Sequence, residues 1–463
     1  MRWLDRLVVP RPALVARWLL ALLLSVALLA RPAAAQSILR DAETEALLND
    51  LARPLIVAAG LRPENVQIAL VGDPEINAFV AGGQIVYINS GLITQADNAN
   101  QVQGVIAHEL GHITGGHIVR MSEGARAATG ISLLSLLLGV AAIAAGGGEA
   151  GMGILSAGQQ AAMGKFLAYS RTQEASADAA GATFLSHAGI SGRGSLEMFG
   201  KFRQMEYRYS SSYADADPYM QTHPMSADRY ERLEAGYKAD PAWDKKTDPA
   251  VEARFQRVKA KLAGYIDDPK VTLNKYPESD QSIPACYARA YAWHKAAYPD
   301  KAVAEIDKLV ATDPHDPYFL ELKGQILLES GKPKEAIPPL REAVERTRST
   351  PLIATLLGHA LIASEDPANL AEARTVLRNA VARDNDNPFA WYQLGIVYSQ
   401  EGDTARAALA TAERYAMTGQ PQLAVANAEA AMRGIPQGTP DYVRAEDIAL
   451  TSRQAIEDRK GRR

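Results

Sequence analysis

The chain has 463 residues, of which 47% are hydrophobic and 22% charged, and this composition excludes a wholly disordered or collagen-like protein. The length predicts two or three domains. A net charge of −4 argues against non-specific binding to nucleic acid, so no nucleic-acid partner is expected. Cys286 is the single cysteine, which excludes an internal disulfide and a cysteine-based metal site.

The N-terminal segment has the three parts of a secretory signal. Residues 1–35 hold five arginines and one aspartate, and an uncharged apolar run occupies residues 18–30. Small residues, Ala33 and Ala35, then stand at the positions that a signal peptidase requires. The run is short for a membrane span, which needs about 20 residues. We therefore expect a signal peptide that is cleaved after Ala35 and an exported mature protein.

The next part of the chain predicts a small α/β unit. Apolar spacing favours a helix over residues 41–59 and another over residues 102–113. Residues 66–71 are typical of a strand, and residues 78–81 and 84–89 are typical of a β-hairpin. An edge strand of that hairpin could bind an extended peptide through backbone hydrogen bonds, or the hairpin could serve only to pack the core.

Residues 127–148 contain no charged side chain, and residues 150–164 contain none either. The second stretch is rich in glycine and holds Gln159 and Gln160. We interpret residues 127–164 as a hairpin that packs over the helix at 102–113 or makes peripheral contact with a membrane surface. A pair of membrane-spanning helices is the less favoured alternative.

The motif His108-Glu109-Leu110-Gly111-His112 is the strongest chemical signal in the chain. Residues four apart lie on one face of a helix, so His108 and His112 can present two imidazoles to one zinc ion. Glu109 lies beside them and can take a proton from a zinc-bound water as the catalytic general base.

A third ligand is needed, and Glu174 is the best candidate. The spacing of a metzincin would require a histidine at position 118, which is an isoleucine, and His117 is one place out of register. Glu174 and Asp178 share one face of a predicted helix over residues 171–187. Glu174 would complete a site with two histidines and one glutamate, and Asp178 would fix the orientation of a ligand histidine.

Three further polar residues are weaker candidates for a role in the site. His117 is expected near the site or at the surface rather than as a ligand. His223, which precedes a proline, and Arg229 are candidate catalytic groups because either could hydrogen-bond a tetrahedral oxyanion. His223 could instead occupy the open position of the zinc ion as a plug.

The C-terminal half carries a repeat. Ala290, Gly324 and Gly358 are each 34 residues apart, and Gly395 follows after 37, which indicates an insertion near residues 365–367. Four residues match the W-x₂-L-G-x₂-Y signature of a tetratricopeptide repeat: Trp391, Leu394, Gly395 and Tyr398. Such helix pairs stack into an α-solenoid.

These observations predict a mainly α-helical protein that joins a zincin-like metallopeptidase domain with a small β-sheet to an α-solenoid of tetratricopeptide repeats. The expected divisions are a signal peptide at 1–35, a metallopeptidase domain at 36–235, a linker helix region at 236–279, a repeat solenoid at 280–450 and a basic tail at 451–463.

With His108, Glu109, His112, Glu174, Asp178 and His223 in this order, the chain resembles gluzincin peptidases of the group that contains the CAAX-prenyl-protein proteases. Together with the predicted export and repeats, the resemblance implies a zinc endopeptidase, with one zinc ion per chain, acting on misfolded or misassembled outer-membrane proteins. It also implies a chaperone-like role in their assembly, and docking of the β-barrel assembly machinery by the repeats.

Two other functions are compatible with the sequence. The chain could be an assembly chaperone or adaptor whose zinc site is idle or plugged by His223. It could also be a membrane-embedded peptidase that uses residues 127–164.

Overall fold

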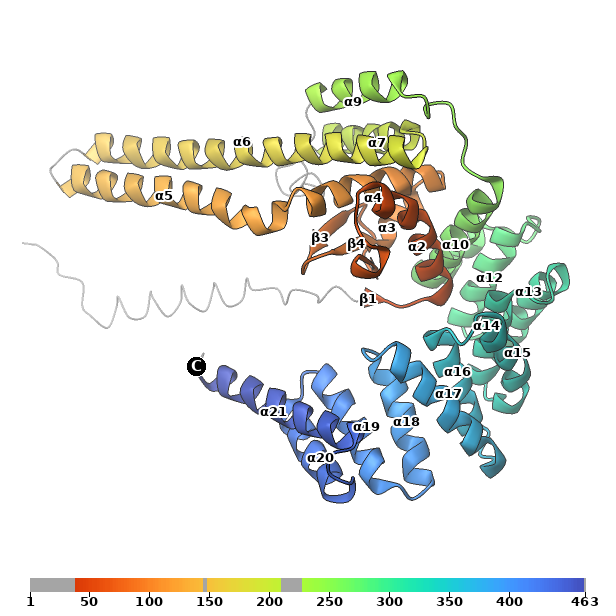
Figure 1. Cartoon of the computed structure of the whole chain (residues 1–463). Coiled ribbons are helices and arrows are strands. Elements are labelled where there is room, and N and C mark those ends of the chain that lie inside the picture. The colour runs from red at the N-terminus through yellow and green to blue at the C-terminus, as the bar shows by residue number, and fades with distance from the viewer. Residues whose placement is uncertain (1–37, 145–147, 210–226, 462–463) are drawn as a thin grey trace, which may run out of the picture. The chain divides into compact units, whose positions relative to one another are not determined.

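The computed structural model describes residues 38–144, 148–209 and 227–461 (Figure 1). Helices account for most of these residues and one small sheet for the remainder of the regular structure, so the expected mainly α-helical fold is confirmed. The expected signal segment at 1–35 and the candidate residue His223 lie outside the described residues.

The sheet has the strand order β1-β2-β4-β3. Its strands are β1 (Ile38–Leu39), β2 (Gln67–Val71), β3 (Ala78–Ala81) and β4 (Ile85–Asn89). β2 and β4 are parallel, with Ile68 opposite Val86, and β3 and β4 form the expected antiparallel hairpin, with Val80 opposite Val86. Within the described residues, β3 is therefore an edge strand.

Seven helices in the described part of residues 39–239 surround or extend from this sheet. They are α2 (Ala42–Ala58), α3 (Ser90–Gln95), α4 (Ala99–Thr114), α5 (His117–Ala144), α6 (Gly148–Ala188), α7 (Arg193–Tyr209) and α9 (Ala227–Ala239), and a short 3-10 turn, η1 (Pro63–Asn65), precedes β2. Asp41 caps α2 and Asn98 caps α4 through side-chain hydrogen bonds to the first turn. The core between these elements includes Leu51, Val86 and Val105.

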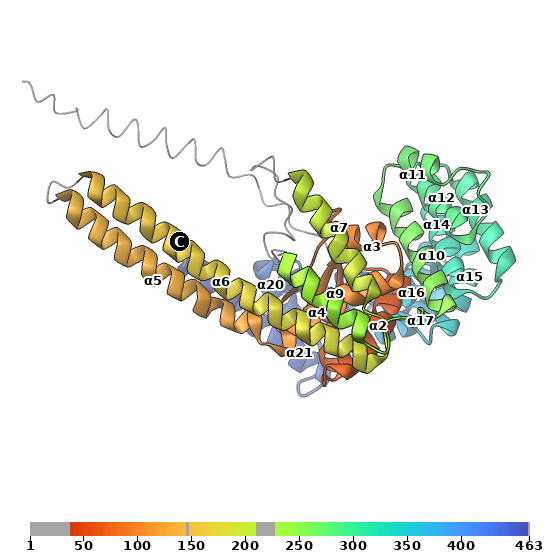
Figure 2. The same cartoon turned by 90° about the horizontal axis from the view of Figure 1, so that it is seen from above.

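The helix expected at 171–187 is not separate, which corrects the sequence interpretation. α6 continues from the apolar stretch through this segment because no proline interrupts residues 148–188. α5 and α6 lie side by side (Figures 1 and 2). Among the described residues, we find no helix with the length and apolar character needed to cross a membrane.

α10 (Pro249–Ile266) and α11 (Pro269–Lys275) occupy the stretch expected as a linker. α10 buries Phe255, Val258 and Leu262 in the same core as the sheet and α4. It also packs against α12, the first helix of the repeats. α10 therefore belongs structurally to both parts of the chain.

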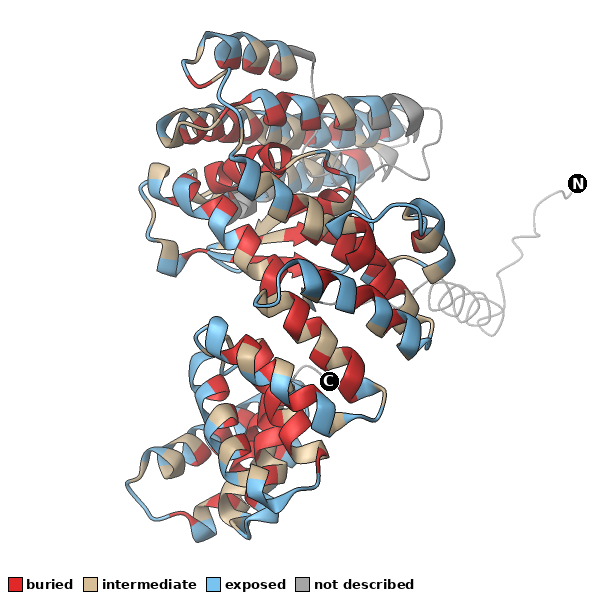
Figure 3. Ribbon diagram, turned by 90° about the vertical axis from the view of Figure 1, so that its right-hand side faces the viewer, coloured by how far each residue is buried: buried red, intermediate tan, exposed pale blue. Residues whose placement is uncertain are grey.

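The repeat region consists of antiparallel helix pairs whose inner faces are buried (Figure 3). Its helices are α12 (Ile283–Lys295), α13 (Pro299–Thr312), α14 (Pro317–Glu329), α15 (Pro333–Arg346), α16 (Pro351–Ala363), α17 (Leu370–Arg383), α18 (Pro388–Gln400), α19 (Thr404–Met417), α20 (Pro421–Gly434) and α21 (Pro440–Gly461). Proline at the first or second position begins most of them.

The 34-residue register has a packing reason. A Cβ at Gly324 would lie 2.3 Å from Leu340, and one at Gly358 would lie 2.5 Å from Leu377, so each glycine lets the second helix of its pair approach closely. The extra residues before Gly395 include a 3-10 turn, η2 (Pro367–Asn369). The segment expected as a tail from 451 instead continues α21 to Gly461.

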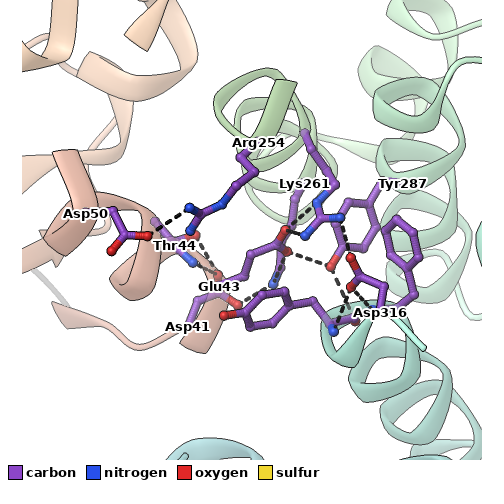
Figure 4. A network of polar contacts seen from close by, with 11 residues as sticks. Asp41, Glu43, Thr44, Asp50, Arg254, Lys261, Tyr287 and Asp316 are labelled. Atoms are coloured by element: carbon purple, nitrogen blue, oxygen red, sulfur yellow. Dashed lines mark hydrogen bonds and ion pairs between the residues drawn. The ribbon is translucent and has the colours of Figure 1, made fainter. Parts of the chain in front are cut away.

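A buried polar network joins the two parts (Figure 4). Glu43 of α2 accepts hydrogen bonds from Arg257 of α10 at 2.5 Å and from the hydroxyl of Tyr287 of α12 at 2.8 Å. Lys261 of α10 lies 2.5 Å from Asp41 and 3.3 Å from Glu43. Arg257 also pairs with Asp316, which caps α14. The network thus links the N-terminus of α2 to the first repeats.

Removing the charge of Glu43 should destabilise this junction. Its side chain is 2% exposed, and a Glu43→Gln variant would leave the buried Lys261 and the half-buried Arg257 with less compensation, at a cost of about 3 kcal/mol. Arg254→Gln is the matched control because the Arg254–Asp50 pair is solvent-exposed and is worth less than about 1 kcal/mol. Urea unfolding of the wild type and the two variants measures both losses of stability. Equal losses in the two variants would contradict the stabilising role given to Glu43.

Candidate metal centre

α4 presents the two histidines of the motif on one buried face. The helix runs from Ala99 to Thr114, so His108 and His112 are one turn apart, and their exposed fractions are 2% and 8%. Their Nε2 atoms lie 3.1 Å apart. Glu109, between them in sequence, is 1% exposed. The spacing read from the sequence therefore yields two convergent imidazoles in a buried setting.

α6 brings the carboxylate of Glu174 to these imidazoles. Oε2 of Glu174 lies 3.4 Å from Nε2 of His108, and Oε1 lies 3.4 Å from Nε2 of His112. In the described part of the chain, these three residues form the one group of histidine, cysteine or acidic side chains compact enough to hold a metal ion. Ligand atoms about 2.1 Å from a tetrahedral zinc ion lie about 3.4 Å from one another. The donor set and its spacing therefore fit such an ion.

The approach of α6 to α4 depends on a glycine inside the motif. A Cβ at Gly111 would lie 2.6 Å from the carbonyl oxygen of Ala177 and 2.8 Å from its Cα. These are backbone atoms, which cannot move without shifting α6. Ala177 itself is fully buried. Gly111 therefore sets the distance between the helix of the histidines and the helix of Glu174.

Asp178 and Arg229 fix the orientation of the proposed ligands. Oδ1 of Asp178 lies 3.0 Å from Nδ1 of His108, which leaves Nε2 of this ring to face Glu174. Arg229 of α9 donates to both oxygens of Asp178, at 2.7 and 2.9 Å, and lies 3.0 Å from Oε2 of Glu174. The Arg229 side chain is 1% exposed. It thus contacts two of the acidic groups around the site.

A second line of contacts supports His112 and was not anticipated from the sequence. Nδ1 of His117 lies 2.9 Å from Nδ1 of His112, and Nε2 of His117 lies 3.0 Å from the hydroxyl of Ser176. His117 thus joins the first turn of α5 to α6. The sequence left His117 either near the site or at the surface, and these contacts place it near the site. Ser176 lies between Glu174 and Asp178 in sequence. This position is the one feature of the sequence that could have indicated its contact with the site.

The acidic surroundings favour positive charge at His108. Burial alone would lower the pKa of this imidazole, but hydrogen bonds to Asp178 and Glu174, and their charges, raise the pKa to about 10. Burial likewise opposes ionisation of Asp178, yet His108 and Arg229 lower the pKa of its carboxyl below the ordinary value. A site built in this way attracts a cation, and in the free protein His108 holds a proton that a metal ion must displace.

Substituting Gly111 should weaken metal binding without touching a ligand. In a Gly111→Ala variant the new Cβ would push α6 away, and we expect at least a tenfold loss of zinc affinity. Gly200→Ala in α7 is the control because a Cβ there meets no atom within 4 Å. Competition with a chromogenic chelator measures both affinities. Unchanged binding by Gly111→Ala would refute the packing argument.

Metal binding should release a proton. Because the pKa of His108 is raised, the ring is protonated near neutral pH in the free protein, and its deprotonation makes zinc affinity rise about tenfold per pH unit below the shifted pKa. Titration calorimetry in buffers of different ionisation enthalpy counts the protons released at about pH 7. Binding that releases no proton and does not vary with pH would contradict this account.

Comparison with known proteins agrees with the geometry. A model described as peptidase family M48 matches residues 39–236. The chain is 24% identical to the beta-barrel assembly-enhancing protease of Escherichia coli (strain K12), over 86% of this chain and 80% of that protein. It is 32% identical to metalloprotease LoiP of the same strain, over 39% of this chain and 65% of that protein.

Among solved structures, YrrB, described as a TPR protein with an unusual peptide-binding site, aligns with 38% of this chain and 92% of its own chain, at 18% identity and a TM-score of 0.32. The helix pairs of α12 to α21 and their 34-residue register supply the repeat assignment independently. Residues 39–236 thus match peptidase family M48, a family of metallopeptidases, and tetratricopeptide-type helix pairs follow this segment in the chain.

Proposed function

We propose that this chain is an exported zinc endopeptidase, with one zinc ion per chain, that cleaves misfolded or misassembled proteins of the bacterial outer membrane. The observation that carries the proposal is the convergence of His108, His112 and Glu174, with Glu109 in the same helix turn. Two imidazoles and one carboxylate are a donor set typical of catalytic zinc, because they leave one position open.

Zinc held by His108, His112 and Glu174 would supply a Lewis acid that lowers the pKa of a water and polarises the scissile carbonyl. Glu109 would accept a proton from the attacking water and then pass it to the leaving amine as the C–N bond breaks. Burial of Glu109 beside His108 keeps bulk water from competing for this proton. The balance of the reaction is the addition of one water molecule across one peptide bond.

The supporting polar groups take different parts in this proposal. Arg229 holds Asp178 and Glu174 in place, and its contacts favour this positioning role over the direct oxyanion contact considered from the sequence. His223 remains a proposed catalytic group that either stabilises the oxyanion or plugs the open position of the zinc ion.

The edge strand β3 offers a way to hold substrate. α4 packs against β3, so a peptide added to this edge would pass beside the helix that carries the histidines. Backbone hydrogen bonds at such an edge need no particular side chains, and only an unfolded segment can adopt the extended form. This mode of binding suits misfolded proteins of many sequences.

Substrate class and location rest on the relatives and the N-terminal segment. The name of the Escherichia coli relative places that protein in β-barrel assembly, and we extend this role, including a chaperone-like part, to the present chain. We propose a periplasmic location after cleavage behind Ala35. The repeats would dock substrates or the β-barrel assembly machinery.

An assembly chaperone or adaptor is the second candidate, with a zinc site that is idle or plugged by His223. The specific observation in its favour is the length of the repeat array, which runs from α12 to α21 and offers a large surface for partners. In this case the metal would stabilise the fold rather than hydrolyse peptides.

A Glu109→Gln variant should separate the two candidates. It removes the proton acceptor and retains all three ligands, so we expect the zinc content to be unchanged and casein cleavage to fall by about a thousandfold. Zinc analysis and a fluorescent casein assay measure the two quantities.

An Asp50→Asn variant is the control because the pair of Asp50 with Arg254 is solvent-exposed, and it should cleave casein normally. If Glu109→Gln still corrects an outer-membrane assembly defect in cells that lack the protein, the adaptor role dominates. Casein cleavage by Glu109→Gln at the wild-type rate would rule out the proposed mechanism.

A further inference from the structure

The outward face of α5 exposes a group of large apolar side chains. The exposed fractions are 69% for Leu137 and 56% for Leu133, and Leu134, Leu136, Leu138 and Val140 are also exposed. A group of adjacent exposed leucines usually marks a surface that contacts another molecule or a membrane.

The contact between α5 and α6 uses small residues where a water-soluble hairpin would use leucines. A Cβ at Gly139 would lie 2.6 Å from Leu155, and one at Gly158 would lie 1.9 Å from the hydroxyl oxygen of Ser135. The glycines are buried between the helices, whereas the leucines of α5 point outward. Close packing through small residues with large apolar groups outside is the arrangement of helices in lipid.

The two helices differ in their outer faces. On α6, Ser156, Gln159 and Gln160 are exposed, with scattered methionines beside them. The hairpin therefore has a strongly apolar side formed by α5 and a more polar side formed by α6. This difference favours a hairpin that lies in a membrane surface over one that crosses the membrane.

Basic side chains border the apolar side. Arg126 stands 7 and 11 residues before Leu133 and Leu137, so all three lie on one face of α5. Arg126 is exposed, as are Lys165 and Arg171 where α6 leaves the uncharged stretch. Glu149, close to the start of α6, is the single acidic residue between Arg126 and Lys165. Cations next to an apolar face complement anionic lipid headgroups.

We propose that α5 docks the protein on an anionic phospholipid membrane surface, with its outward leucines among the acyl chains and Arg126 and Lys165 at the phosphates. A protein partner would not require small residues inside the hairpin and leucines outside it. A spanning arrangement would expose the polar face of α6 to lipid. The combination of these features therefore favours the surface of a bilayer.

This docking would place the metal site close to the lipid. Lys165 and Glu174 are nine residues apart on α6, which corresponds to about 13 Å along the helix. A polypeptide at the membrane surface would then lie within reach of the site. This consequence rests on the proposed peptidase function, whereas membrane docking itself does not.

A fluorophore on the hairpin tests the docking directly. Cys286 is 2% exposed, so a thiol introduced by Leu137→Cys can be labelled selectively with an environment-sensitive nitrobenzoxadiazole dye. The protein is produced with its own N-terminal segment, so that any processing by the cell is retained. Leu450→Cys in α21 is the matched control because Leu450 is 63% exposed.

With vesicles of phosphatidylethanolamine and phosphatidylglycerol, we expect brighter, blue-shifted emission from position 137 and no change from position 450. Vesicles of phosphatidylcholine alone should give a weaker response, because they lack the anionic charge. Equal responses at both positions, or no response at 137, would overturn the proposal. It would also be overturned by a response at 137 that depends on higher protein concentration and not on vesicles. The last outcome would indicate a second copy of the chain as the occupant.

Flotation with the same anionic vesicles provides a second measurement. A Leu134→Gln/Leu137→Gln variant should bind at least about tenfold more weakly than Leu450→Gln. Retained zinc would show that the variant is folded, and undiminished flotation would also overturn the proposal. Cleavage of soluble casein should be unchanged, so a failure of docking can be distinguished from a failure of the peptidase proposal.

Discussion

The close contact between α4 and α6 is the constraint on which the candidate metal centre depends. Gly111 meets the backbone of Ala177, and one turn further along α6 a Cβ at Gly181 would lie 3.1 Å from the backbone of Ala107. Two glycines, one in each helix, therefore allow the helices to approach at backbone distance. Because of this approach, the short carboxylate side chain of Glu174 reaches both imidazoles, and Asp178 reaches the far nitrogen of His108.

The same helices connect the centre to the rest of the molecule. α5 begins at His117, which contacts His112. α6 carries Glu174 in the part of the helix that packs against α4. Both helices also form the apolar hairpin. A membrane surface that binds the hairpin would therefore bind the same two helices that position the ligands. α10 contributes both to the core that contains residues of α4 and to the polar network of Glu43 and Lys261. The repeats are thus joined to the domain by α10, both through its packing and through buried charges.

Much of this arrangement could be predicted from local sequence patterns. The spacing of His108 and His112 specifies one helix face, and the 34-residue spacing of Gly324 and Gly358 specifies the helix pairs. Contacts between distant segments could not be predicted in this way. Ser176 reaches His117 across 59 residues, and Glu43 reaches Tyr287 across 244 residues, with no periodic signal to join them. The continuity of α6 was missed because a change from apolar to charged composition resembles an element boundary, although no proline ends the helix.

X-ray absorption at the zinc edge of the purified protein tests the central claim most directly. If His108, His112 and Glu174 hold one zinc ion, the spectrum should show multiple-scattering features of two imidazoles, oxygen neighbours at about 2.0–2.2 Å and no sulfur. The metal content should then be close to one zinc ion per chain. A spectrum with an all-oxygen shell, or a protein that retains no zinc after removal of loosely bound ions, would contradict the convergence of these three side chains on one cation.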